Sequence, residues 1–269
     1  MNDAMTIPVE SPHMRAEADG PIGWMTFNKP EKLNAVSLDM WEAMGTIIER
    51  FEADPAVRVI VLKGAGERAF VSGADISQFE KARSSAETNA HYEVVSERAL
   101  QILAACGKPV IAMIGGYCIG GGLAIAASCD VRIATEGSTF GIPAARLGVG
   151  YGAAGVKKLV ELVGPSYTKE IFFTARRFTA GEARDMGLIN RVVPHDALEE
   201  YTRGYCATIA ENAPKTMNTL KRTVAEVTRG HEADWALCDR LVGDCFASED
   251  FIEGRRAFME KRRPVFRGA

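Results

Sequence analysis

The chain has 269 residues, of which 47% are hydrophobic and 25% are charged, and its net charge is −3. This composition is typical of a globular protein, and a mildly acidic balance gives no general attraction for nucleic acid or for an anionic membrane surface. No uncharged apolar run reaches the roughly 18 residues of a membrane span, and the N-terminus lacks the basic and apolar regions of a signal peptide. We therefore expect a cytoplasmic protein without nucleic-acid or membrane partners.

The first two thirds of the chain show strand and helix patterns in alternation. Residues 1–13 are expected to form a loose tail. Helical spacing of apolar residues predicts helices over Ser37–Asp54 and Thr88–Cys106. Apolar, β-rich runs predict strands at Ile22–Phe27, Val57–Lys63, Pro109–Ile114 and Val131–Ala134. Strands that alternate with helices are typical of an α/β fold with crossover connections.

After about residue 153 the strand pattern fades and helical patterns dominate. They cover Ala153–Val163, Pro165–Thr174, Ala180–Gly187, Asp196–Glu211, Pro214–Arg229, Glu232–Ala247 and Ser248–Arg262. Several of these helices have apolar faces broader than one core needs, which favours contact with another subunit over a single compact core. A shift in composition near residue 195 suggests a core over residues 14–195 and a C-terminal helical region over residues 196–269.

A cluster of glycines separates a predicted strand from a predicted helix. The run GGYCIGGGLAIAASCD, residues 115–130, has five glycines in its first eight positions and leads into a helix expected over Gly121–Ser128. A helix that begins on glycine presents free N–H groups at the positive end of its dipole and lets a ligand approach the main chain closely. Such a turn suits a phosphate, a carboxylate or an oxyanion.

A second stretch has the same character. AFVSGADI, residues 69–76, follows the predicted strand Val57–Lys63 and places Ser72, Gly73 and Ala74 at a turn. The simpler interpretation of either stretch alone is a tight turn with no functional role. Taken together, they suggest that one N–H group from each turn converges on a single oxygen atom.

The two stretches resemble motifs of the crotonase, or enoyl-CoA hydratase/isomerase, superfamily, namely FxxGADI followed by GxxxGGG. The resemblance extends from about residue 14 to residue 266 and includes NKPEKLNA at 28–35, FGIP at 140–143 and FMEKRRP at 258–264. It implies a spiral of ββα repeats with C-terminal helices that assemble homotrimers or homohexamers. It also implies an acyl-CoA thioester as substrate, with no metal and no cofactor beyond the substrate's own coenzyme A.

The resemblance also implies roles for individual residues. By position, the N–H groups of Ala74 and Gly121 would form an oxyanion hole that stabilises a thioester enolate. Lys32 is similar to residues that meet the CoA phosphates, and Phe258 and Lys261 to residues that cap the CoA, sometimes across a subunit boundary. The remaining positions implied to line the site are Ser72, Gly73, Asp75, Ile76 and Gly120.

The sequence departs from the hydratases of this superfamily at two positions. Those enzymes have one glutamate three residues after the oxyanion glycine and another directly after the FGxP turn, where this chain has Ala124 and Ala144. Hydration needs an acid and a base, each contributing about 10²–10⁴-fold, and alanine supplies neither. The departure favours decarboxylation or another lyase or isomerase reaction. The alternatives are a hydratase with atypical residues and a non-catalytic acyl-CoA-binding relative.

The loop after Ala144 supplies the remaining candidates. Tyr151 resembles the tyrosine of members that decarboxylate short branched malonyl-CoA thioesters, although those members have histidine at the position of Ala74. It is a candidate to donate a proton or to orient an acyl carboxylate, and Arg146 is a candidate either to pair with that carboxylate or to fix the loop. The match of GYGAAG, residues 150–155, to the dinucleotide pattern GxGxxG lacks a convincing preceding strand, which disfavours a nicotinamide enzyme.

Overall fold

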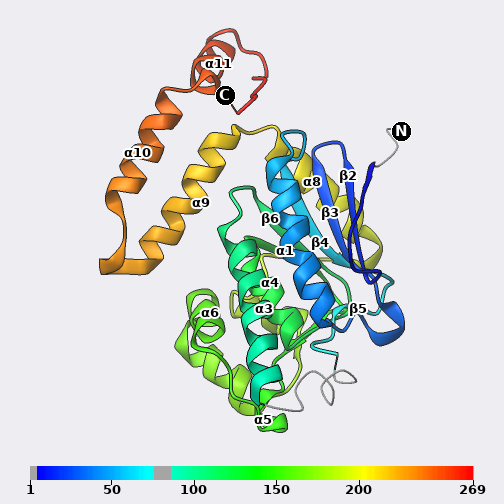
Figure 1. Cartoon of the computed structure of the whole chain (residues 1–269). Coiled ribbons are helices and arrows are strands. Elements are labelled where there is room, and N and C mark those ends of the chain that lie inside the picture. The colour runs from blue at the N-terminus through cyan, green and yellow to red at the C-terminus, as the bar shows by residue number, and fades with distance from the viewer. Residues whose placement is uncertain (1–4, 76–85, 269) are drawn as a thin grey trace.

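The fold is that of a computed structural model, which describes residues 5–75 and 86–268. It contains two sheets (Figure 1). The larger sheet has the order β1 (Met5–Ile7), β2 (Met14–Asp19), β3 (Ile22–Phe27), β4 (Val59–Gly64), β6 (Val110–Ile114), β8 (Val131–Thr135) and β11 (Arg191–Val193). The smaller sheet has the order β10 (Phe178–Thr179), β9 (Thr139–Gly141), β7 (Tyr117–Ile119) and β5 (Ala69–Val71).

A strand–strand–helix unit repeats along the chain. β4, β6 and β8 are parallel neighbours in the larger sheet, and the strands that follow them, β5, β7 and β9, are parallel neighbours in the smaller one. Helices α3 (Ala86–Ala105) and α4 (Gly121–Ser128) complete the first two units. Each unit therefore advances one position in both sheets, which confirms the predicted spiral of ββα repeats.

The larger sheet is buried on both faces. Ile60 and Leu62 of β4 belong to the main core with α1 (Leu38–Ala53), α3 and α4, whereas Val59 and Val61 face a second core that includes Cys206 of α8 (Leu198–Ala210). Side chains alternate between the two faces of a strand, so a strand covered on both faces reads as a continuous apolar run. This is the pattern that identified β3, β4, β6 and β8 in the sequence.

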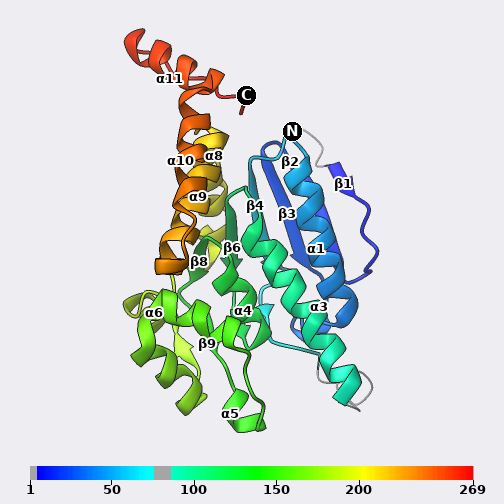
Figure 2. The same cartoon turned by 60° about the vertical axis from the view of Figure 1, so that its left-hand side comes forward.

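The last three helices project from this core as an arm (Figures 1 and 2). The arm consists of α9 (Pro214–Arg229), α10 (Trp235–Phe246) and α11 (Glu249–Met259). α8, by contrast, packs on the sheet through Leu198 and Cys206. The chain thus leaves the core between α8 and α9, later than the division expected near residue 195. Large apolar side chains remain exposed on the arm, namely Leu220, Val224, Val227, Trp235, Val242, Phe246, Ile252, Phe258 and Met259.

Short helices, turns and an edge strand complete the fold. The remaining helices are α5 (Ala144–Leu147), α6 (Ala153–Thr174) and α7 (Ala180–Asp185), with 3₁₀ turns at Pro30–Lys32, His195–Ala197 and Gly230–Glu232. Gly164 inside α6 has non-helical dihedral angles directly before Pro165, so α6 is divided where two separate helices were predicted. Met5–Ile7 pair with β2, so the tail expected over residues 1–13 contains an edge strand. Among the helices of the described ranges, none has the length and apolar character of a membrane span.

Candidate active site

The two glycine-containing turns meet at the start of α4. A Cβ atom placed on Gly121, the first residue of α4, would lie 3.9 Å from the Ala74 nitrogen and 3.9 Å from the Gly73 carbonyl carbon. One placed on Gly120 would lie 3.8 Å from the Gly73 Cα atom. The backbones of the two turns are therefore close neighbours, although nearly fifty residues of chain separate them.

The glycines allow this close approach. A Cβ atom on Gly122 would lie 2.2 Å from the Val71 carbonyl oxygen, so no side chain fits where α4 passes β5. Gly120 has a φ of +55°, a conformation that glycine adopts readily, and its N–H donates to the Gly141 carbonyl oxygen over 2.8 Å. The start of α4 is thus fixed between β5 and β9.

Two backbone donors remain available where the turns meet. Gly121 lies in the first turn of α4, where N–H groups have no acceptor within the helix. On either side of Ala74, the Gly73 carbonyl accepts from the Val36 N–H over 2.8 Å and the Asp75 N–H donates to the Val36 carbonyl over 3.0 Å. Within residues 5–75 and 86–268, neither the Ala74 N–H nor the Gly121 N–H has a hydrogen-bond acceptor.

A buried ion pair supports the first turn. The Asp75 carboxylate lies 2.7 Å from the Lys29 ammonium, and only 4% and 6% of the two side chains are exposed. The Lys32 ammonium, whose side chain is 44% exposed, approaches the same carboxylate at 3.3 Å. The charge of Lys32, expected to serve CoA phosphates, is therefore partly engaged by Asp75. Lys29 was missed in the sequence because no local pattern distinguishes it from a surface lysine.

The rest of the first turn is fixed through its backbone. The Ser72 N–H donates to the Leu33 carbonyl over 3.1 Å, and the Ser72 hydroxyl lies 3.4 Å from the Lys32 carbonyl. Ser72 is thus joined to the loop that also carries Lys29 and Lys32. Ile76, the last residue assigned to this turn, lies outside the described residues.

The two alanines occupy different surroundings. Ala124 is half-buried on α4, one turn after Gly121, and Ala144 is a buried member of the main core at the start of α5. Across the described part of the chain, no group of three or more histidine, cysteine, aspartate or glutamate side chains is placed to hold a metal ion. Any polar assistance at these alanines must come from other residues or from the ligand.

Tyr151 and Arg146 differ in burial. Tyr151 packs edge-on against Phe172 of α6, with ring centroids 4.9 Å apart, and burial raises the pKa of its hydroxyl to about 12. At neutral pH the hydroxyl is therefore protonated and able to donate. Arg146 is exposed on α5. Among the described residues, neither side chain has a hydrogen-bond partner that ties it to the two turns.

Comparison with known proteins identifies the family. The sequence model described as enoyl-CoA hydratase/isomerase matches residues 17–269. The chain belongs to the enoyl-CoA hydratase/isomerase family.

Relatives of this family align along nearly the whole chain. A short-chain-enoyl-CoA hydratase of Clostridium acetobutylicum is 35% identical, with 92% of this chain and 94% of that protein covered. A carnitinyl-CoA dehydratase of Salmonella typhi is 34% identical, with 93% and 96% covered. The crystal structure of an enoyl-CoA hydratase/carnithine racemase from Magnetospirillum magneticum superposes with a TM-score of 0.91 at 33% identity and covers 97% of both chains.

Two residues expected from the family pattern lie apart from the turns. Phe258 is 82% exposed on α11 and Lys261 follows that helix. α11 is carried outward by α9 and α10, and in both views it lies at the opposite end of the molecule from α5 (Figures 1 and 2). Within one chain, Phe258 and Lys261 therefore lie apart from the two turns, and their assignment to CoA capping stays a prediction.

The C-terminal end of α4 is also fixed. The buried Arg132 guanidinium donates to the carbonyls of Cys129 over 2.7 Å and Ala126 over 3.2 Å, and to the Leu188 carbonyl over 2.8 Å. A cation at this end of a helix is favoured by the helix dipole. Burial raises the pKa of the Cys129 thiol to about 12. The thiol is therefore protonated at neutral pH and is not a nucleophile, because the thiolate is the reactive form.

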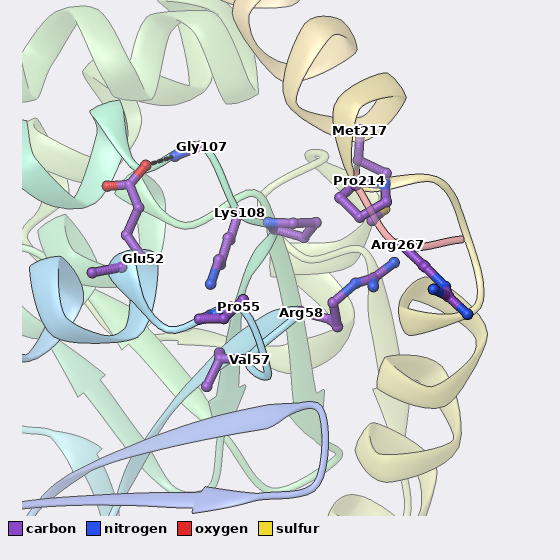
Figure 3. Close-up of a pocket in the computed structure, with 12 residues that line it drawn as sticks. Glu52, Pro55, Val57, Arg58, Gly107, Lys108, Pro214, Met217 and Arg267 are labelled. Carbon is purple, nitrogen blue, oxygen red and sulfur yellow. Dashed lines mark hydrogen bonds between the residues drawn. The ribbon is translucent and has the colours of Figure 1, made fainter. Parts of the chain in front are cut away.

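A cavity of about 260 Å³ lies in another part of the molecule, between the end of α1, the start of β6 and the start of α9 (Figure 3). Two of its cations are already engaged. Arg58 donates to the carbonyls of Phe266 over 3.2 Å and Asn212 over 3.1 Å, and the Lys108 ammonium donates to the carbonyls of Phe51 and Asp54. These side chains join the C-terminal segment and the turn before α9 to the core.

Proposed function

We propose that this member of the family is a cytoplasmic enzyme that binds an acyl-CoA thioester and stabilises its enolate between the N–H groups of Ala74 and Gly121. The observation that carries the proposal is the close approach of the two turns, which leaves both N–H groups without an acceptor in the described chain. Negative charge grows on the thioester oxygen as the enolate forms, and one fixed donor at such an oxygen contributes about 10²–10³-fold.

Decarboxylation of a 2-carboxyacyl thioester is the reaction that these residues favour. The bond between the α-carbon and the carboxylate breaks, carbon dioxide leaves, and the electron pair passes into the enolate. The α-carbon then takes up a proton, for which the protonated Tyr151 hydroxyl or water is the donor. These reaction steps need neither of the glutamate carboxylates for which this chain has Ala124 and Ala144. Coenzyme A takes part only as a portion of the substrate.

Hydration is the second candidate, because relatives along the whole chain are named for it. The Clostridium acetobutylicum protein is a short-chain-enoyl-CoA hydratase and the Salmonella typhi protein a carnitinyl-CoA dehydratase. For this chain, hydration would require a water-activating group other than residues 124 and 144.

Incubation with crotonyl-CoA and with methylmalonyl-CoA separates these reactions. We expect methylmalonyl-CoA to lose carbon dioxide, and crotonyl-CoA to be hydrated at least about 10²-fold more slowly than a typical rate of tens per second. Chromatography of the thioesters measures both. Rapid hydration would refute the interpretation of the two alanines, and tight thioester binding without turnover of any member of a broad panel would indicate a binding protein.

Tyr151→Phe tests the proton donor. Loss of a general acid costs about 10²–10⁴-fold, so we expect kcat for decarboxylation to fall by about 10²-fold while KM changes little. Tyr167→Phe is the matched control. Tyr167 is exposed on α6, the helix whose Phe172 packs against Tyr151. An unchanged kcat for Tyr151→Phe would leave water as the proton source.

We also propose that the protein forms a homotrimer or homohexamer. The exposed apolar side chains of α9, α10 and α11 support this, because such a surface is unusual on a monomer. A second copy would then bring its own Phe258 and Lys261 toward the site. Light scattering in solution tests the assembly, and a molar mass of one chain would contradict it.

A further inference from the structure

A buried lysine lies directly behind the first of the two donor turns. The Lys29 ammonium is 2.7 Å from the Asp75 carboxylate, and only 6% and 4% of the two side chains are exposed. Asp75 follows Ala74 in the chain. Covalent geometry therefore keeps its carboxylate within about 8 Å of the Ala74 nitrogen in any rotamer. A charge on either member of this pair acts on the place where the thioester oxygen would lie.

The loop that carries Lys29 is fixed by hydrogen bonds. The Lys29 N–H donates to Asn34 Oδ1 over 3.0 Å, and the Asn34 N–H donates to the Lys29 carbonyl over 2.9 Å. The Asn34 side-chain amide donates in turn to the carbonyls of Ala65 over 3.0 Å and Ala69 over 2.8 Å. Ala69 begins β5, the strand that leads into the first turn. Lys29 and the first turn are thus parts of one hydrogen-bonded frame.

A buried ion pair is not the most stable way to fill this position. Removing two charges from water is costly, and apolar side chains of similar volume in their place are often neutral or stabilising. Without Lys29, the carboxylate would leave a negative charge near an oxygen that becomes negative in the enolate. At about 8–10 Å and an effective dielectric constant of about 20, one unit charge changes such an equilibrium by about tenfold or more. The lysine therefore has a chemical use that packing alone does not provide.

We propose that Lys29 sets the charge of the oxyanion site by offsetting Asp75. Lys29 does not touch the thioester and acts through Asp75 as a positioning residue. The charge that grows on the thioester oxygen then meets the Ala74 N–H without an opposing charge behind it. Lys32 contributes less, because it is 44% exposed and water screens its ammonium. The inference rests on the proposed function, because it requires the thioester oxygen to lie at this turn.

Spectrophotometric titration of bound acetoacetyl-CoA tests the inference without requiring turnover. This thioester ionises at the carbon between its two carbonyl groups, and the enolate absorbs at a different wavelength from the neutral form. The proton passes to the solvent, and the electron pair passes into the enolate. A site that stabilises this charge raises the enolisation constant of the bound thioester. We expect the native protein to raise it at least about tenfold above its value in water.

The decisive comparison is between Lys29→Met and Asp75→Asn. Each variant leaves one buried charge without its partner, so both should lose comparable stability in urea. The charge that remains is negative in the first and positive in the second, whatever else contacts Asp75. We expect the enolisation constant of bound acetoacetyl-CoA to be at least about tenfold lower for Lys29→Met than for Asp75→Asn. A purely structural role would lower both constants equally.

Two further variants separate charge from damage to the fold. The double variant Lys29→Met with Asp75→Leu removes both charges, and its constant should lie within about threefold of the native one. If Lys29→Met does not fold, Asp75→Asn should still exceed the double variant at least about threefold, because it keeps one positive charge. Lys221→Met is the matched control. The Lys221 ammonium lies 2.8 Å from Asp130, which follows the opposite end of α4 from Gly121, so this variant should keep the native constant.

The outcomes distinguish this inference from the proposed function. Equal constants for Lys29→Met and Asp75→Asn, together with a raised constant for the native protein, would overturn the role of Lys29 and leave the oxyanion site intact. If Lys29→Met does not fold, equal constants for Asp75→Asn and the double variant would do the same. A native protein that does not bind acetoacetyl-CoA, or does not raise its enolisation constant, would overturn the proposed enolate site and the role of Lys29 with it.

Discussion

Gly122→Ala is expected to destroy the thioester site and to destabilise the fold by about 3 kcal/mol or more. The new Cβ atom would lie 2.2 Å from the Val71 carbonyl oxygen and 2.8 Å from the Val71 Cβ atom. Val71 belongs to β5, which pairs with β7, so α4 cannot move away without carrying Gly121 away from Ala74. Urea-induced unfolding measures the stability, and calorimetry with butyryl-CoA measures the site.

Gly204→Ala is the matched control. Gly204 lies inside α8, and a Cβ atom there would meet nothing within 4 Å. Alanine in an exposed helix interior is favoured over glycine by about 0.5–1 kcal/mol, so this variant should be slightly more stable than the native protein and bind thioester normally. If Gly122→Ala proved as stable as Gly204→Ala, β5 and α4 would not be in contact as described.

Asp75→Asn is expected to cost about 3–5 kcal/mol, because it leaves the buried Lys29 ammonium without its carboxylate. The affinity for thioester should fall as well, since Asp75 directly follows Ala74. Urea-induced unfolding and calorimetry again provide the measurements. The double variant Lys29→Met with Asp75→Leu should recover most of the stability, because it removes both buried charges.

Lys32→Gln provides the comparison for this pair. Lys32 approaches the same carboxylate at 3.3 Å but is 44% exposed, and exposed ion pairs contribute only about 0–1 kcal/mol. The loss of stability should therefore be several times smaller than for Asp75→Asn. If the two variants lost equal stability, water would have to reach the Lys29 ammonium, and the Lys29–Asp75 ion pair would not be buried.

Elements with a strong local signal could be predicted from the sequence. β3, α4 and α9 have the bounds expected from the apolar runs, the glycine cluster and Pro214, and the division of α6 at Gly164 was visible as glycine followed by proline. β5, β7 and β9 were missed because each has three residues, too few to show a period. Their pairing depends on neighbours from other repeats rather than on local propensity.

The candidate site was predictable only in part. The turns at Ala74 and Gly121 could be found because glycine-rich strand ends have a chemical meaning of their own. The Lys29–Asp75 pair joins residues 46 positions apart. In the sequence these residues look like a surface lysine and a helix-cap acid. Only the tertiary fold brings them together.

The regular advance of the spiral has a consequence for how the chain folds. β6 pairs with β4, and β8 pairs with β6 on its other side. Strands that are neighbours in the sheet therefore come from consecutive repeats of the chain. The entropy of closing a loop rises slowly with its length, and parallel sheets fold slowly because their contacts are distant in sequence. Here that cost is divided into two steps, the second of which closes a shorter stretch of chain than the first. The sheet is therefore able to grow from β4 toward β8 in the order in which the ribosome releases its strands.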